Sequence, residues 1–296
     1  MKTTALSSLA FLLVLCTASP AAEKLLLRQN WKTGQVYTIE NQTQMTMTMA
    51  GLGAQAGAND TNMTQTMTIT VKPDGAAGNK AAEIKFTGIK ADMAMMGQKM
   101  TYDSSDPAKS PPFLQQSFGA LVNKSFTMVF DKENKYVESR GLEALSEGTP
   151  LGKSQALKGD QMAAMFRKSF EMSLPKEPIA PGESWNFEDK MEMGPIGSIS
   201  IKIVGKFDSI VDREGHKHAK LLLSGTFSSP EAGGAAAGMV KFGEGSTFTG
   251  ETYFNLDEGV SSYSETHSDL KINAAGQEMP IKQTNVNKIV SIEAAK

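Results

Sequence analysis

The chain has 296 residues and carries 30 Lys and Arg against 32 Asp and Glu, which gives a formal net charge of −2 at pH 7. The two signs are interspersed, so the sequence offers no basic field that would attract nucleic acid or an anionic membrane surface. Beyond the N-terminal segment no apolar run reaches the about 18 residues that a membrane-spanning helix needs. We predict neither a nucleic-acid partner nor a transmembrane segment in the mature chain.

The N-terminal segment has the organisation of a secretion signal. Lys2 precedes an apolar run at residues 6–15, and Ser19-Pro20-Ala21 fits the small-x-small pattern of a cleavage site. We therefore expect residues 1–22 to be a signal peptide and the mature protein to be exported, either periplasmic or extracellular. The single cysteine, Cys16, lies inside this segment. A mature chain without thiols has no disulfide, no catalytic cysteine and no cysteine-based zinc site.

Most of the remaining sequence alternates apolar and polar residues over short segments between turn signals, which is typical of antiparallel strands. Residues 34–49 show this first, and successive side chains of a strand point to opposite faces. The large apolar residues that share one face are Tyr37, Ile39, Met45, Met47 and Met49. Alternation resumes in residues 63–71 and 82–89, with a bulge expected at Gly88. The pattern predicts a mainly β protein.

The second half repeats the scheme. Residues 185–193, 199–207 and 219–227 alternate in the same way, and Gly182-Glu183-Ser184-Trp185 resembles Gly34-Gln35-Val36-Tyr37. We predict an internal duplication, with an N-terminal β repeat at 23–174 that carries helical insertions and a C-terminal β repeat at 175–296. A stiff connector with prolines at 175, 178 and 181 marks the boundary. The expected fold is half-barrel-like, built from two curved antiparallel sheets or from one large sheet.

Two short helices are expected to cover the sheet. Ser110 can cap a helix over residues 110–122, and Asp160 can cap another over residues 160–172. Each has an apolar stripe at helical spacing, which is typical of a helix that lies across a sheet face.

No sequence motif for catalysis is present, whether a nucleophile elbow, a zinc-protease helix, a phosphate-binding loop or a dinucleotide fingerprint. We predict no cofactor and favour a non-catalytic protein. His216 and His218 lie two residues apart near Asp212 and Glu214, which is compatible with a surface metal site. The favoured interpretation is an ordinary exposed hairpin.

The 18 methionines are the unusual feature of the composition. Thioethers are ligands for Cu(I), and the candidate ligands are Met45, Met47, Met49, Met63 and Met67. Methionine is also a flexible apolar core residue, and period-two placement is what a buried face requires. Core packing is the favoured reading. A pliable apolar binding surface and a copper site are the alternatives.

Three stretches resemble a known family. They are Trp31-Lys32-Thr33-Gly34-Gln35-Val36-Tyr37, the Met/Thr-alternating strand behind it, and Pro181-Gly182-Glu183-Ser184-Trp185. In these the chain resembles a family of exported bacterial proteins of unknown function, DUF6263. The resemblance implies a bacterial envelope location and carries over no catalytic or binding residue. The expected architecture is also similar to that of half-barrel lipoprotein carriers, in which helices cover a curved sheet.

Together these features lead to a functional expectation. We expect a non-catalytic extracytoplasmic protein that binds an apolar ligand or another envelope component through the concave face and the two helices. The alternative is a periplasmic protein that handles Cu(I) through methionines, and an envelope hydrolase is the least favoured reading.

Overall fold

The computed structural model describes residues 23–48, 58–75, 78–95, 98–146, 163–164, 167–168, 172–192, 198–229, 240–274 and 277–295. The predicted signal peptide at 1–22 lies outside the described residues, as do Met49 and Asp160.

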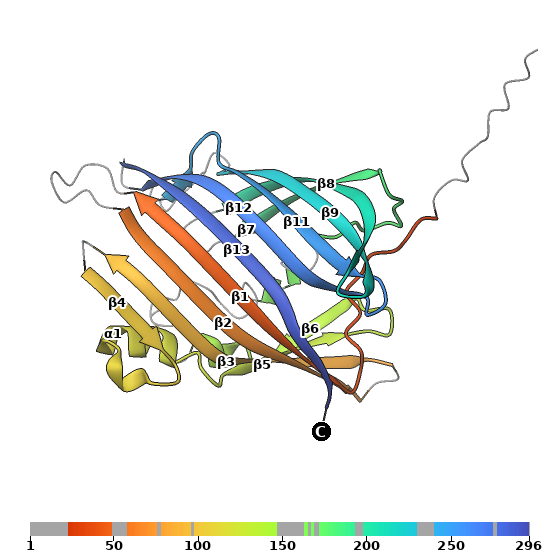
Figure 1. The fold of residues 1–296 in the computed structure, drawn as a ribbon, viewed down its shortest axis with the longest axis horizontal. Helices are drawn as coiled ribbons and strands as arrows, with labels where there is room; N and C mark the ends of the chain where they lie inside the picture. Colours follow the sequence, from red (N-terminus) through yellow and green to blue (C-terminus); the bar gives the residue numbers. More distant parts are fainter. Residues whose placement is uncertain are drawn as a thin grey trace, which may run out of the picture.

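One antiparallel sheet contains nearly all the regular structure of the described ranges (Figure 1). Its strands are β1 (Gln35–Thr48), β2 (Ala58–Pro73), β3 (Lys80–Met95), β4 (Gln98–Asp103), β5 (Ser125–Phe130), β6 (Tyr136–Arg140), β7 (Ser184–Glu192), β8 (Ser198–Arg213), β9 (His216–Ser228), β10 (Val240–Phe242), β11 (Thr247–Asn255), β12 (Val260–Ala274) and β13 (Gln277–Ala294). The order across the sheet is β6-β5-β3-β2-β1-β13-β12-β11-β9-β8-β7, with β4 on β3 and β10 on β12. The sheet curls but does not close, so the predicted curved antiparallel architecture is confirmed as one large sheet.

The middle of the sheet is a seam between its first and last strands. β1 pairs with β13 from Gln35↔Ala294 to Met47↔Ile281, and the two run side by side along the centre of Figure 1. Strands β1 to β6 therefore lie on one side of the seam and β7 to β13 on the other. The proline connector lies between the two edge strands, β6 and β7. The division into two repeats stays a prediction.

The inner, concave face of the sheet holds the core. Residues paired across neighbouring strands share a face, so Tyr37, Ile69 and Ile84 lie in one row on β1, β2 and β3. All three are buried. In the other half the same face carries Ile201 and Leu221, which are buried, while Lys202 is exposed, as the alternation predicted. The predicted bulge is also present, because the pairing of β2 and β3 shifts between Thr66 and Met67, opposite Gly88.

Short helical pieces pack against the inner face, the first three near β4 and the last near β5. They are η2 (Pro107–Lys109), α1 (Pro112–Leu114), the π-helical η3 (Gln115–Gly119) and, further on, α2 (Glu143–Ser146). Leu114 and Phe118 pack with Ile89 and Tyr102, so the predicted covering role of residues 110–122 is confirmed. The prediction of a single regular helix over residues 110–122 was wrong. The prolines at 111 and 112 are tolerated because they lie at the start of α1, but α1 passes directly into the π-helical η3, and the chain has left helical geometry by Asn123, whose φ is 65°. Of the second predicted helix, over residues 160–172, the structure describes residues 163–164 and 167–168, which are helical, and Met172, which lies in a turn.

Two irregular stretches lie against the inner face of the second half. Leu25 and Ile179 exchange backbone hydrogen bonds of 2.9 Å in both directions, which joins residues 24–34 to residues 172–181. Leu27 and Leu174 pack in one cluster with Phe207. The concave face is therefore partly filled by chain from outside the sheet.

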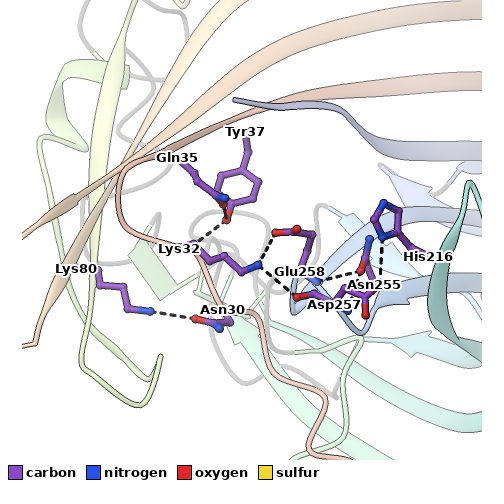
Figure 2. A network of polar contacts seen from close by, with 9 residues as sticks. All are labelled: Asn30, Lys32, Gln35, Tyr37, Lys80, His216, Asn255, Asp257 and Glu258. Carbon is purple, nitrogen blue, oxygen red and sulfur yellow. Dashed lines mark hydrogen bonds and ion pairs between the residues drawn. The ribbon is translucent and has the colours of Figure 1, made fainter. Parts of the chain in front are cut away.

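A polar network fixes the N-terminal stretch to the end of the sheet (Figure 2). Lys32 Nζ lies 2.7 Å from Glu258 Oε2 and donates to the Asp257 carbonyl at 3.3 Å, which binds the turn between β11 and β12. The Lys32 backbone N–H donates to the Tyr37 hydroxyl at 3.0 Å, and that hydroxyl donates to Gln35 Oε1 at 2.6 Å. Burial raises the pKa of Tyr37 above its ordinary value. The network serves to hold residues 24–34 in place.

On the outer face, Arg213 at the end of β8 lies over two tyrosine rings, one from β11 and one from β12. The Arg213 guanidinium lies 4.6 Å from the centre of the Tyr253 ring and 4.3 Å from that of Tyr263. The Tyr263 hydroxyl donates a 2.6 Å hydrogen bond to Glu265 Oε2. This hydrogen bond to the carboxylate favours the neutral phenol and, with burial, raises the pKa of Tyr263 to about 12.

We expect the substitution Glu265→Gln to lower the pKa of Tyr263, because the charged acceptor that favours the neutral phenol is removed. Since the pKa in the folded state lies above the ordinary value of 10.0, the stabilisation is complete below about pH 10 and is lost as the pH rises towards 12. A spectrophotometric titration of tyrosinate measures the change, and Tyr263→Phe identifies which step belongs to this residue. An unchanged titration curve in Glu265→Gln would contradict the assignment.

Candidate functional site

A cavity of about 320 Å³ lies on the inner face, and we call it the inner cavity. Strands from both sides of the seam line it. Its apolar wall consists of Ile39, Met67, Ile69, Ile84, Phe126 and Ile289. Its polar wall consists of Gln29, Asn41, Ser173, Thr252, Ser261, Ser264, Asn287 and Lys288. The volume is at the lower end of the range of small-molecule sites, about 300 to 1,000 Å³. Such a two-sided lining suits a ligand with both apolar and polar parts.

Two hydroxyl groups in the polar wall are buried without a hydrogen-bond partner. Thr252 is 1% exposed, and neither its Oγ1 nor the Oγ of Ser261 has a partner. A buried hydroxyl that makes no hydrogen bond costs roughly 1 to 3 kcal/mol. The arrangement therefore favours a bound molecule that brings hydrogen-bonding atoms into the inner cavity.

The polar wall continues to solvent along β1 and β13. Asn41 Nδ2 donates to Asn287 Oδ1 at 2.6 Å, and Thr43 Oγ1 donates to Asn285 Oδ1 at 2.8 Å. Asn41 is half-buried and Asn287 is exposed. A ligand in the inner cavity thus has a polar route along the seam.

A second cavity, of about 360 Å³, adjoins the first, and we call it the basic cavity. Gln29 lines both, and the consecutive residues Ser173 and Leu174 line one each. Four basic side chains, and no Asp or Glu in the described ranges, line the basic cavity: Arg28, Lys135, Arg167 and Lys176. Apolar groups, among them Met128 and Phe130, complete the wall.

The four cations differ in how well they are neutralised. Lys135 Nζ forms a 2.6 Å ion pair with Glu133. Arg28 Nη1 donates to the backbone carbonyl of Glu133 at 3.2 Å, which supplies no counter-charge. The Arg167 guanidinium lies 5.8 Å from the centre of the Tyr136 ring, and its Nε is buried without a partner.

The fourth cation of the basic cavity is Lys176, whose Nζ lies 5.5 Å from the centre of the Phe187 ring. Asp131 does not line the cavity, but the charges of two of its cations act on the Asp131 carboxylate. Its carboxylate accepts backbone hydrogen bonds from Lys135 and Glu133, which with the charges of Lys135 and Arg28 hold its pKa below the ordinary value. Positive charge therefore predominates in the wall of the basic cavity.

A larger cavity of about 580 Å³ lies beside β7 and differs in character. Its lining mixes Lys24 and Lys176 with Glu177, Glu183 and Glu188. Lys24 pairs with Glu183 at 2.9 Å. Because its wall mixes both signs of charge, it offers less basis for selecting a ligand than the two cavities on the inner face.

The predicted methionine ligands do not form one cluster in the described residues. Met63 packs against the apolar cluster around Ile89, and Met67 packs with the core and lines the inner cavity. These two residues are four apart on β2, about 13 Å at strand spacing. Met45 and Met47 are half-buried on the inner face. Met63 and Met67 pack as the core interpretation predicts, and a copper site stays the alternative hypothesis.

The exposed-hairpin reading is right for His216 and wrong for His218. His216 is exposed and its Nδ1 lies 3.1 Å from Asp257 Oδ2. His218 is 3% exposed, because its side chain lies over β12, where Nε2 bonds Ser262 Oγ at 3.0 Å. Within the part of the chain that the structure describes, no group of three or more His, Cys, Asp or Glu could hold a metal ion.

Apart from Met67, which was a candidate methionine, the residues of the two cavities were not singled out as site residues in the sequence. One signal was present, because Asn41 and Thr43 interrupt the apolar odd positions of β1 between Ile39 and Met45. A polar break in a core-facing alternation indicates a wetted part of that face. Thr252 and Ser261 gave no comparable signal, since their burial depends on strand pairing.

The model of a family of unknown function, DUF6263, matches residues 77–214. The predicted resemblance is confirmed over that span, which includes Pro181-Gly182-Glu183-Ser184-Trp185 and leaves out the Trp31–Tyr37 motif. No curated protein matches the sequence. None of the helices in the described ranges has the length and apolar character that crossing a bilayer requires.

Several solved structures are similar at low identity. A structure of lipid–protein interactions in lipovitellin has a TM-score of 0.49 and 10% identity over 90% of this chain. The chain spans only 26% of that lipovitellin chain. DynF from Micromonospora chersina has a TM-score of 0.23 and 6% identity, covering 91% of this chain and 90% of its own. A β-barrel-like protein of the DUF1849 family from Brucella abortus has a TM-score of 0.23 and 8% identity. The match covers 91% of this chain and 100% of that chain.

Proposed function

We propose that this protein is a non-catalytic, extracytoplasmic binding protein that holds an amphipathic small molecule on the concave face of its sheet. The observation that carries the proposal is the inner cavity, in which an apolar wall faces two buried hydroxyl groups without partners. Export is part of the proposal and rests on the predicted signal peptide.

The apolar and polar walls contribute to ligand binding in different ways. Burial of apolar ligand surface against side chains such as Ile39, Met67 and Phe126 contributes about 25 cal/mol per Å². The hydroxyls of Thr252 and Ser261 add little affinity each but orient the ligand, because a polar atom placed elsewhere would leave them unpaired. No group in this wall needs to act as an acid, base or nucleophile.

Native mass spectrometry of the mature protein tests the function. A non-covalent adduct of amphipathic small molecules, released by denaturation and identified by mass, is the expected result. Metal analysis of the same sample addresses the methionine alternative, for which stoichiometric copper is the supporting outcome. A protein that carries no adduct and binds none of a panel of fatty acids, lysolipids and monoglycerides would contradict the proposal.

We expect Thr252→Val to raise the free energy of unfolding by about 1 kcal/mol while weakening ligand binding. The substitution keeps the side-chain shape but removes a buried hydroxyl that has no partner in the free protein. With ligand bound, the same change removes a hydrogen bond, worth about 0.5 to 1.5 kcal/mol. Denaturant melts and ligand titrations give the two values independently.

Adjacent serines on β12 provide the matched control. Ser262 Oγ bonds His218 and the Tyr253 carbonyl, whereas Ser261 Oγ has no partner. Ser262→Ala should therefore destabilise the protein without affecting the ligand, and Ser261→Ala should be neutral or stabilising and weaken binding. If Thr252→Val and Ser261→Ala bind ligand as tightly as the unaltered protein, the polar wall plays no part.

A further inference from the structure

We propose that the ligand carries an anionic headgroup, which the basic cavity binds while the apolar part of the same molecule occupies the inner cavity. The class is a single-chain anionic amphiphile, with either a carboxylate or a phosphate as the headgroup. The inference rests on the proposed function and specifies its ligand.

The first argument is charge complementarity. Four basic side chains and no acidic one of the described residues line the basic cavity. Like charges that share a partly enclosed cavity repel one another, and an anion among them converts that repulsion into attraction. Among the described residues, Lys135 alone of these four cations has a carboxylate partner within ion-pair distance.

The second argument is the chemistry of the donors. Arg28 and Arg167 present planar guanidinium groups, which match the geometry of a carboxylate or phosphate. The Nε of Arg167 is buried and makes no hydrogen bond. An oxyanion would satisfy this donor and would supply the counter-charge that the neighbouring aromatic ring of Tyr136 cannot.

The third argument is continuity. Both cavities are lined by Gln29, and the chain passes from one to the other between Ser173 and Leu174. The basic cavity also has apolar wall from Leu27, Met128 and Phe130. A ligand that leaves the cationic site towards the inner cavity therefore stays against apolar surface.

The experiment compares three probes with the same acyl chain, each below its micelle concentration at neutral pH. They are laurate, lauroyl lysophosphatidylglycerol and the uncharged monolaurin. We expect both anions to bind at least tenfold tighter than monolaurin, with the difference shrinking as salt is added. The two anionic arms distinguish a free fatty acid from an anionic lysolipid as the preferred source of the charge.

The variant Arg167→Gln/Lys176→Gln removes two cations that have no carboxylate partner in the described residues. It should weaken the binding of laurate at least tenfold and change that of monolaurin less than twofold. The control is Lys202→Gln/Lys206→Gln, which removes two exposed cations from the outer face of β8 and should leave both affinities unchanged. Circular dichroism and a denaturant melt show whether each variant folds.

The outcomes separate the two proposals. If all three probes bind equally and Thr252→Val weakens them, the binding function stands and the anionic headgroup is wrong. If the basic-cavity variant weakens monolaurin as much as laurate, the headgroup assignment is also wrong. If no probe binds the folded protein, the proposed function itself fails.

Discussion

Replacing Leu221 with Ala should lower the free energy of unfolding by about 2 to 5 kcal/mol, through lost burial and an unfilled cavity. Leu221 is 0% exposed and lies between Phe207 of β8 and Thr252 of β11 on the inner face. Urea denaturation, monitored by circular dichroism, gives the value.

Leu222 is a matched control in the next position. It is 37% exposed and points to the outer face, since neighbouring residues of a strand alternate. Leu222→Ala should change the free energy of unfolding by no more than about 0.5 kcal/mol. Equal losses in the two variants would mean that the inner and outer faces of β9 are wrongly assigned.

Gly225→Ala should destabilise the protein by about 1 to 3 kcal/mol or more, because the added methyl group has no room. A Cβ at this position would lie 2.3 Å from the Lys202 carbonyl oxygen and 2.4 Å from the Phe248 ring. The backbone oxygen belongs to a paired strand and cannot move aside independently. The free energy of unfolding and the melting temperature report the effect.

Gly88→Ala provides the comparison. Its Cβ would meet Thr66 at 3.6 Å, an ordinary van der Waals contact, so the change should be tolerated. A Gly225→Ala variant as stable as Gly88→Ala would show that β8, β9 and β11 pack more loosely around this glycine than the structure describes.

Much of the fold could be predicted because period-two alternation is a local signal. The inward positions of β8 and β9, such as Ile201 and Leu221, follow from side-chain alternation alone. The pairing of β1 with β13 could not be predicted, because no local sequence pattern shows which distant strand pairs with the edge of β1. The same limit left one sheet or two as open alternatives.

The candidate site was less predictable than the fold for a related reason. Arg28, Lys135 and the pair Arg167 and Lys176 come from three separate parts of the sequence, and they meet only when the irregular stretches pack against the inner face. Each alone resembles an ordinary surface cation. The exposure of His218 was mispredicted for the same reason. Its hairpin was expected to be exposed, but a strand from later in the chain pairs with β9 and the side chain is buried.

The seam between β1 and β13 has a consequence for how the molecule assembles. Of the described strands, β1 comes first in the sequence and β13 comes last, so the central hydrogen bonds of the sheet join segments that are more than 200 residues apart, as in Gln35↔Ala294. Contacts of such long sequence separation slow folding, because the entropy of a large loop is lost before they form. Until β13 arrives, β1 keeps an open edge that can pair with other chains. A chaperone that holds this strand would protect the nascent protein at its most aggregation-prone stage.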